Sequence, residues 1–297
     1  MRQRRVSIAL AAMVIGVMVA AGCAPTAPQP GASCSANPVL EPGAQLQYCD
    51  LSGRNLVGVD LHRANLAGAN LSFAQLDGAN LSEANLTLAV LQGADLTDAN
   101  LYATQSGGAN FSSANLTRTN LSSSIVSLAV FLYANLTDTN LTGDDLRYAD
   151  LTNLDLSLPI MVGVNLEGKD LRSNDLSGAR LTGAFLGAVN LTGVNASGAD
   201  LSGTQIFATA PGANLTGANL QAALIVDSDF TNGSFANANL TNATIDNLVA
   251  GGANFTGSTR TGLSWVGTHF LTGAICGSGS TYPGTGVGGE PIPCLGV

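Results

Sequence analysis

The sequence predicts an all-β solenoid, in which the chain winds repeatedly around one apolar column. Two observations support this prediction. At every fifth position from Leu46 to Ile206 stands a large apolar residue in 31 of 33 cases, and 26 of these positions are Leu. A small residue, usually Ala, stands two positions before each of them, and Asn or Asp usually stands one position before. Internal repetition at a fixed period identifies repeat architectures, so this spacing decides the fold class.

A period of five fits neither a helix nor a straight strand. Every fifth residue of a helix lies about 140° further around it, so the leucines would cover the whole surface. In a strand, a step of five places them on alternate faces. The chain must therefore turn once per repeat, always toward the same side. The exceptions to Leu at these positions are Ser106, Phe111, Val126, Phe131, Met161, Ala196 and Ile206.

The other positions of the repeat favour such turns. Asn and Asp tolerate turn conformations, and their side chains bond nearby backbone groups. Glycine, which bends most easily because it has no Cβ, recurs two residues after the leucine. These glycines include Gly53, Gly58, Gly68, Gly78, Gly93, Gly178, Gly183 and Gly193.

The pattern, as in Ala64-Asn65-Leu66 and Ala69-Asn70-Leu71, resembles the pentapeptide-repeat family, A-(D/N)-L-x-x, over about 210 of 297 residues. The resemblance implies a right-handed quadrilateral β-helix with one repeat per side and twenty residues per coil. With a second set of positions from Leu215 to Phe255, we expect about ten coils and a rod about 50 Å long.

The period breaks in two places. Nine residues separate Ile206 from Leu215, which predicts an insertion near 207–213 that bulges out as a loop. Such loops often carry binding sites, although a merely tolerated insertion is the alternative. Beyond Phe255 the period decays, and Trp265, Phe270 and Ile275 restore it. We therefore expect the β-helix to span 46–275, with a last irregular coil at 258–275.

Residues 1–23 are typical of a bacterial export signal. Arg2, Arg4 and Arg5 precede an apolar run that ends in small residues. The segment Ala20-Ala21-Gly22-Cys23 resembles a lipobox, with Ala20 where Leu is usual, and the resemblance implies that Cys23 becomes a lipidated N-terminus. Ordinary signal-peptide cleavage is the alternative. This predicts a protein outside the cytoplasm, attached to the cell membrane through a lipid anchor at Cys23.

The segments around the repeats look like a tether and two caps. Residues 24–45 begin with a Pro-rich stretch, and residues 276–297 are rich in Gly and Pro. Cysteines bracket the array, and an oxidising compartment favours one disulfide at each end, although three pairings are possible. Cys49 occupies an inward position, so a buried free thiol is the alternative there. The predicted pairs are Cys34–Cys49 and Cys276–Cys294.

A few polar residues occupy the small inward position two before the leucine. A charge in so narrow a core is costly unless it is paired. Asp144 and Lys169 lie one coil plus one side apart, so they could form an inward ion pair. Alternatively, these sides deform and the charges reach solvent. The residues concerned are Arg54, Asp144, Lys169 and Asn174.

The chain is acidic, with a net charge of −9 that becomes −12 once Arg2, Arg4 and Arg5 are removed. Arg147 should lie beside Glu167 in the next coil and form a surface pair. A twenty-residue coil also stacks carboxylates into ladders that could hold a divalent cation loosely, face a basic partner, or simply be solvated. The candidate acidic surface comprises Asp145, Asp150, Asp155, Asp170 and Asp175.

Nothing in the sequence indicates catalysis. The only histidines are His62 and His269, which lie far apart in the pattern. No catalytic triad, phosphate loop, metal site or cofactor site appears. We therefore expect a non-enzymatic cell-envelope lipoprotein whose rod binds an envelope or extracellular protein and no nucleic acid. A homodimer through a solenoid end is a further possibility.

Two alternatives stay open. Some members of the family are acidic rods that mimic DNA and interact with DNA gyrase, and the resemblance extends to this chain's acidity and length. The export signal argues against this function, because an exported rod would not meet a cytoplasmic enzyme. The other alternative is a divalent-cation-responsive envelope module built on the acidic ladders.

Overall fold

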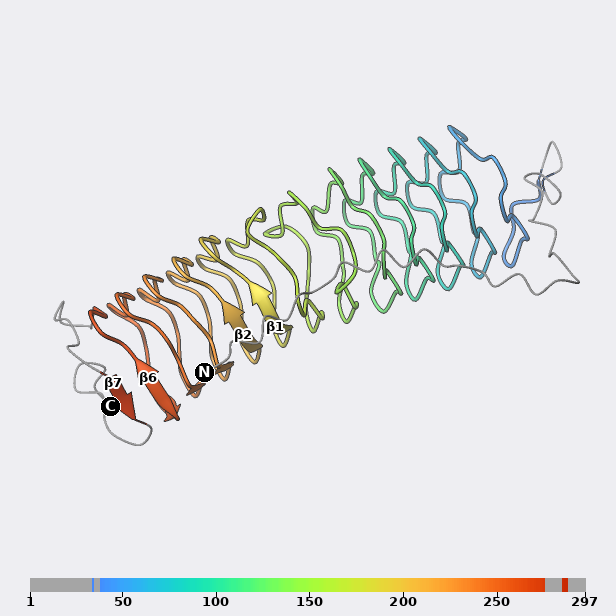
Figure 1. Cartoon of the computed structure of the whole chain (residues 1–297). Coiled ribbons are helices and arrows are strands. Elements are labelled where there is room, and N and C mark those ends of the chain that lie inside the picture. The colour runs from blue at the N-terminus through green and yellow to red at the C-terminus, as the bar shows by residue number, and fades with distance from the viewer. Residues whose placement is uncertain (1–33, 35–37, 276–284, 288–297) are drawn as a thin grey trace, which may run out of the picture.

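The computed structural model describes residue 34, residues 38–275 and residues 285–287, and residues 38–275 form one long rod (Figure 1). Successive turns of the chain stack along the rod axis as a parallel β-solenoid. No helix occurs among the residues described. The all-β solenoid predicted from the five-residue period is therefore confirmed.

Each turn pairs with the next through parallel bridges twenty residues apart. Four columns of bridges, five residues apart along the chain, surround the axis, as in Asn65↔Asn85, Asn70↔Val90, Gln75↔Asp95 and Asn80↔Asn100. The backbone bonds that join the turns are short, and Leu71 N donates to Val90 O at 2.7 Å. These ladders satisfy the main-chain polar groups that the turning chain would otherwise bury unpaired.

The predicted inward positions form the core. The repeat leucines are buried, as are the alanines two residues before them; Leu66, Leu71, Ala64 and Ala69 are each fully buried. Aromatic residues at the same positions stack along the axis, with the rings of Phe111 and Phe131 5.2 Å apart. All of these side chains belong to one continuous cluster, so stacking of turns, rather than any single turn, buries the apolar surface.

The polar positions make the corners. Asp50 Oδ1 accepts a hydrogen bond from Ser52 N at 3.1 Å, and Asn or Asp repeats this contact along the rod. Two residues after the leucine the backbone adopts the left-handed conformation, with φ of 62° at Gly53 and 58° at Leu88. The expectation that Asx side chains and glycines shape the turns is confirmed, although many corners hold other residues in this conformation.

Extended strands appear only in the C-terminal half of the described rod. One parallel sheet contains, in order, β1 to β5, and the short β6 pairs antiparallel with β7 at the C-terminal end (Figure 1). Their bounds are β1 Phe185–Asn190, β2 Gln205–Thr209, β3 Leu224–Val226, β4 Thr244–Asp246, β5 Ser264–Val266, β6 Thr268–Phe270 and β7 Thr285–Val287.

The insertion predicted near 207–213 is wrong. Ala210 is fully buried, and the bridges that cross this turn join residues nineteen apart, as in Asn195↔Asn214. One residue is therefore missing from the turn, and the register shifts in β1 between Gly187 and Val189. The nine-residue step from Ile206 to Leu215 therefore consists of one repeat of four residues and one of five. The small Ala210 occupies the inward position between them.

The period predicted after Trp265 is also wrong by one residue. The bridges Val249↔Phe270 and Asn254↔Ile275 join residues 21 apart, so this turn carries one extra residue. As a result Leu271 is buried, while Phe270 is 50% exposed. Trp265 packs against the end of the core as expected.

Candidate functional site

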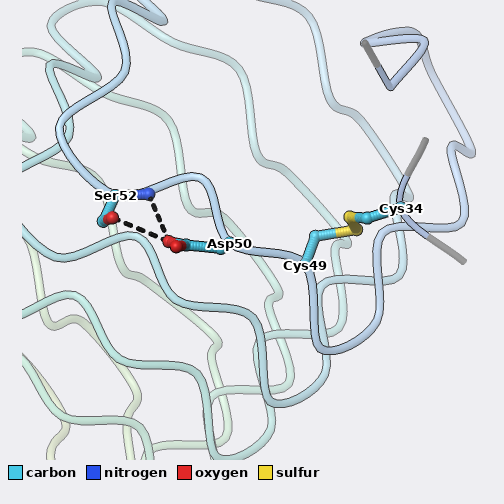
Figure 2. The surroundings of a disulfide bond; sticks show 4 residues. All are labelled: Cys34, Cys49, Asp50 and Ser52. Carbon is cyan, nitrogen blue, oxygen red and sulfur yellow. Dashed lines mark hydrogen bonds between the residues drawn. A yellow bond between two sulfur atoms is a disulfide. The ribbon is translucent and has the colours of Figure 1, made fainter. Parts of the chain in front are cut away.

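A disulfide closes the N-terminal end of the rod. Cys34 and Cys49 are bonded, with their Cα atoms 5.4 Å apart, and Figure 2 shows the bond beside the corner formed by Asp50 and Ser52. Cys49 is completely buried at its inward position, so the bond attaches the preceding segment directly to the core. The predicted partners Cys276 and Cys294, and the lipidation candidate Cys23, lie outside the described residues.

Arginines pair with two of the five carboxylates of the candidate acidic surface, Asp145 and Asp170. Arg147 Nη2 lies 2.7 Å from an oxygen of Asp145, and its Nη1 lies 3.5 Å from Glu167 in the next turn. The predicted pairing of Arg147 with Glu167 is therefore confirmed, and the closer partner is Asp145. Hydrogen bonding to Arg147 lowers the pKa of Asp145, so this carboxylate stays ionised.

The remaining carboxylates of the acidic surface are held by an arginine or by hydrogen bonds from their own corners. Arg172 Nη2 lies 2.6 Å from an oxygen of Asp170, and this contact lowers the pKa of Asp170. Asp155 and Asp175 are bridge partners in adjacent turns, and each accepts a backbone amide from the serine two residues on. Hydrogen bonds from Thr152 lower the pKa of Asp150. The five carboxylates thus lie on the rod surface, each held by a corner or by an arginine.

Asp144 and Lys169 do not form the predicted inward ion pair, and of the two only Lys169 is partly exposed to solvent. Lys169 is half-buried and donates to the carbonyl oxygen of Ala149, while Asp150 and Asp145 are the acidic groups that act on it electrostatically. Asp144 is 1% exposed, so it does not reach solvent. The two groups lie on different sides of the solenoid and do not contact each other.

Asp144 instead ends a buried polar column that sequence analysis missed. The column lies on one side, where Thr104, Ser124 and Asp144 succeed one another at intervals of twenty residues. Thr104 Oγ1 contacts Ser106 Oγ at 2.9 Å and Ser124 Oγ at 3.1 Å, and Ser124 N donates to Asp144 Oδ1 at 2.9 Å. The sequence does contain a signal for this column, because polar residues stand twenty apart at the small inward position.

Burial controls the chemistry of Asp144. Desolvation raises the pKa of its carboxyl to about 8, against weaker lowering by the amides of Ser124 and Ser123. Its Oδ2 has no hydrogen-bond partner among the described residues. A carboxyl that is mostly protonated at neutral pH and enclosed in an apolar core has no route to a substrate, so we assign it to the core rather than to a reaction.

The two histidines are also separate. His62 lies at a corner, with Nδ1 3.0 Å from both the carbonyl and the hydroxyl oxygens of Ser82 in the next turn. His269 is buried near the C-terminal end, where Leu248 N donates to its Nδ1 at 3.2 Å and Trp265 packs edge-on. Burial lowers the pKa of His269. His62 has the Ser82 hydroxyl beside it, and among the described residues neither imidazole belongs to a metal-ligand set.

The described residues contain no group of three or more His, Cys, Asp or Glu arranged to hold a metal ion. Within the same part of the chain, no helix is long and apolar enough to cross a membrane. The exterior carries rows of hydrogen-bonded polar side chains, acid–arginine pairs and exposed apolar side chains.

Comparison with known proteins agrees with this architecture. The family profile of pentapeptide repeats matches the chain in eight copies, which cover residues 44–82, 74–104, 127–158, 134–173, 149–187 and 170–205. No curated protein sequence matches the chain.

Several solved structures are similar. HetL, a pentapeptide repeat protein involved in heterocyst differentiation regulation from the cyanobacterium Nostoc sp. strain PCC 7120, is 26% identical; the match covers 83% of this chain and 94% of HetL, with a TM-score of 0.29. A pentapeptide repeat protein from the Arabidopsis thaliana thylakoid lumen is 33% identical over 33% of this chain and 66% of that protein, with a TM-score of 0.31.

A third similar structure is that of QnrB1, a plasmid-mediated fluoroquinolone resistance protein. It is 16% identical, with 71% of this chain and 89% of QnrB1 covered and a TM-score of 0.27. The family profile, the repeat sequence and the stacked five-residue sides agree with one another. This chain is a pentapeptide-repeat protein.

Proposed function

We propose that this protein is an exported lipoprotein whose acidic rod acts as a non-catalytic binding or structural module on the cell envelope. The observation that carries the proposal is the fixed exterior of the solenoid. Asn80 Nδ2 donates to Asp60 Oδ1 at 2.9 Å, and similar amide bonds join Asn100 to Asn80 and Asn120 to Asn100. Such ladders hold the side chains in place, which suits recognition by a broad surface.

The absence of an evident reaction centre in the described residues supports binding rather than catalysis. The buried Asp144 is enclosed in the core, and the five carboxylates of the candidate acidic surface are paired with arginine or hydrogen-bonded. We therefore infer that partners contact the outer faces of the rod. The export signal favours proteins of the envelope or of its surroundings as these partners.

The placement outside the cytoplasm rests on residues 1–23. Membrane fractionation and mass spectrometry of the N-terminus test it, with Cys23→Ser as the variant. We expect the natural chain in the membrane fraction with an acylated Cys23, and the variant in the soluble extracytoplasmic fraction. An uncleaved, unmodified N-terminus in the natural chain would refute the anchor. Affinity capture from envelope extracts then tests binding of a partner.

A DNA-mimicking protein that acts on gyrase is the alternative function, and the net charge of −9 is the observation that favours it. The arginine pairs at Asp98, Asp145 and Asp170 weaken the negative field of the rod. A supercoiling assay with purified gyrase separates the two functions. We expect no change in gyrase activity, and inhibition or protection at micromolar protein would favour the alternative.

A cation-responsive module is the third function, and it depends on free carboxylates. Because Arg147 and Arg172 already pair with Asp145 and Asp170, we expect no binding heat with millimolar Ca²⁺ in calorimetry. A saturable heat that disappears in Asp155→Asn would instead support a cation site on the ladder that Asp155 shares with Asp175.

A further inference from the structure

One face of the rod presents exposed apolar side chains in a regular arrangement. Leu88 and Leu128 are 66% and 68% exposed, and Phe73 and Tyr133 are 66% and 70% exposed. All four occupy corners with left-handed backbone, so their side chains project from the rod. The apolar face comprises Phe73, Leu88, Val90, Leu128, Val130 and Tyr133.

The register of the solenoid places these residues on a single side. Val90 and Val130 are both bridged to Asn110, so they flank it along one column. Leu88 and Leu128 lie on the corner at one edge of this column, two turns apart. Phe73 and Tyr133 lie on the corner at its other edge. With about 4.8 Å per turn, Leu88 and Leu128 are about 10 Å apart.

Two of these side chains rest on glycines of the following turn. A Cβ on Gly108 would lie 2.8 Å from a methyl carbon of Leu88, and a Cβ on Gly93 would lie 2.6 Å from the ring of Phe73. The apolar groups therefore lie against the rod and are restrained before any partner arrives. Restraint of this kind lowers the entropy lost on association.

The apolar face is also without charge. Segments 67–73, 87–93, 107–113 and 127–133 build it over four turns, and they contain no Asp, Glu, Lys or Arg. The opposite face is built by segments 77–83, 97–103, 117–123 and 137–143. That face carries Asp77, Glu83, Asp98, Arg118 and Asp138. Over segments 87–93, 107–113 and 127–133, two copies of this acidic chain can meet without bringing carboxylates together.

The order of residues is self-complementary over the three turns of segments 87–93, 107–113 and 127–133, whereas segment 67–73 with Phe73 would lie opposite segment 147–153. If two rods meet antiparallel, with the twofold axis at the turn of Gly108 and Asn110, Leu88 of each copy faces Leu128 of the other. The same operation places Val90 opposite Val130. An isologous interface requires this reciprocity, in which one residue meets a second and the second meets the first.

We propose that two copies of this protein associate antiparallel through the apolar face, with Leu88 of each copy against Leu128 of the other on either side of the twofold axis. The pairing goes beyond the proposed function and does not depend on the lipid anchor. The three self-complementary turns span about 15 Å, so the contact covers a few hundred Å², less than the about 800 Å² per partner of a standard interface. The dimer should therefore be weak and reversible.

Cysteine cross-linking of the full-length chain tests the arrangement. Thr87 and Ser127 precede the two leucines at the same edge, so Thr87→Cys and Ser127→Cys keep the apolar residues. In mixtures of two differently tagged chains, a short bismaleimide should link Thr87→Cys to Ser127→Cys several-fold more than it links either variant to itself. The pair Thr97→Cys and Thr137→Cys has the same spacing on the diagonally opposite corner. Its cross-linking yield under the same conditions gives the level that chance collisions produce.

Aspartate substitutions on the apolar face are the second part of the test. Leu88→Asp with Leu128→Asp should reduce the mixed cross-link at least tenfold, because desolvated carboxylates would then meet apolar groups. Ser123→Asp, at a corner outside the apolar face with the same backbone conformation, is the matched control, and circular dichroism verifies folding of both. Equal yields for the mixed pair and the opposite-corner pair, self-linking of Thr87→Cys above the mixture, or insensitivity to the two aspartates would each overturn the proposal.

Discussion

The backbone amide of Ser124 donates a 2.9 Å hydrogen bond to Oδ1 of Asp144 inside the solenoid, where the carboxyl is 1% exposed. Burial raises the pKa of this carboxyl to about 8. The folded chain therefore binds one more proton than the unfolded chain between about pH 4 and pH 8. The stability that protonation of Asp144 contributes is fully present at about pH 4 and is lost as the pH rises to about 8.

The first prediction follows from this sign. The free energy of unfolding should fall by up to about 1.4 kcal/mol per pH unit between about pH 5 and pH 8 because of Asp144. Asp144→Asn, which has nearly the same shape and no ionisation, should flatten this dependence and be more stable than the natural chain at about pH 8.5. Urea unfolding at both pH values measures it.

The exposed Asp77→Asn is the control and should leave the slope as it is in the natural chain. If Asp144→Asn keeps the full pH dependence, Asp144 does not ionise as its burial requires.

The second prediction concerns a small apolar cavity near the register shift. Its lining includes Leu176, Leu191 and Leu201, together with Ala196, which stands where the repeat usually has Leu. Ala196→Val should fill part of the cavity and raise the free energy of unfolding by about 0.5–2 kcal/mol. The urea midpoint measures the gain.

Ala199→Val is the matched control for this change. Ala199 is fully buried at the small inward position. Enlarging it should overpack the core and cost about 1–3 kcal/mol. Equal destabilisation by both substitutions would mean that Ala196 has no spare room beside it.

The sequence predicts the solenoid and its inward residues because a five-residue period leaves only one way to bury Leu66, Leu71 and their equivalents together. It does not predict the register breaks. A missing residue before Ala210 and an inserted residue before Leu271 change the pairing partners in space. The first shift is hidden because Ala210 is small, and the second because Phe270 and Leu271 are both large and apolar. Counting from one large apolar residue to the next is ambiguous there.

The charged residues show the same limit. The twenty-residue coil predicts that Arg147 meets Glu167, and it does. The closer partner, Asp145, lies two residues away on the same corner, where the turn brings the guanidinium back toward the chain. For Asp144, spacing alone places the residue inward but does not say whether Lys169 on the adjoining side can reach it. That depends on local backbone geometry.

The third prediction concerns the N-terminal end, where the solenoid would otherwise leave a turn unpaired on one side. The bond between Cys34 and Cys49 closes a loop with a sequence separation of 15, for which chain entropy gives about 3 kcal/mol. Cys49→Ala keeps a small apolar side chain inward and removes only the bond. Hydrogen exchange should then speed up in residues 38–60 and stay unchanged near the turn of Phe131. Cys34→Ala should reproduce the effect, since it breaks the same bond from outside the core. Faster exchange in Cys49→Ala but not in Cys34→Ala would assign the stabilisation to packing at Cys49 instead of to the disulfide.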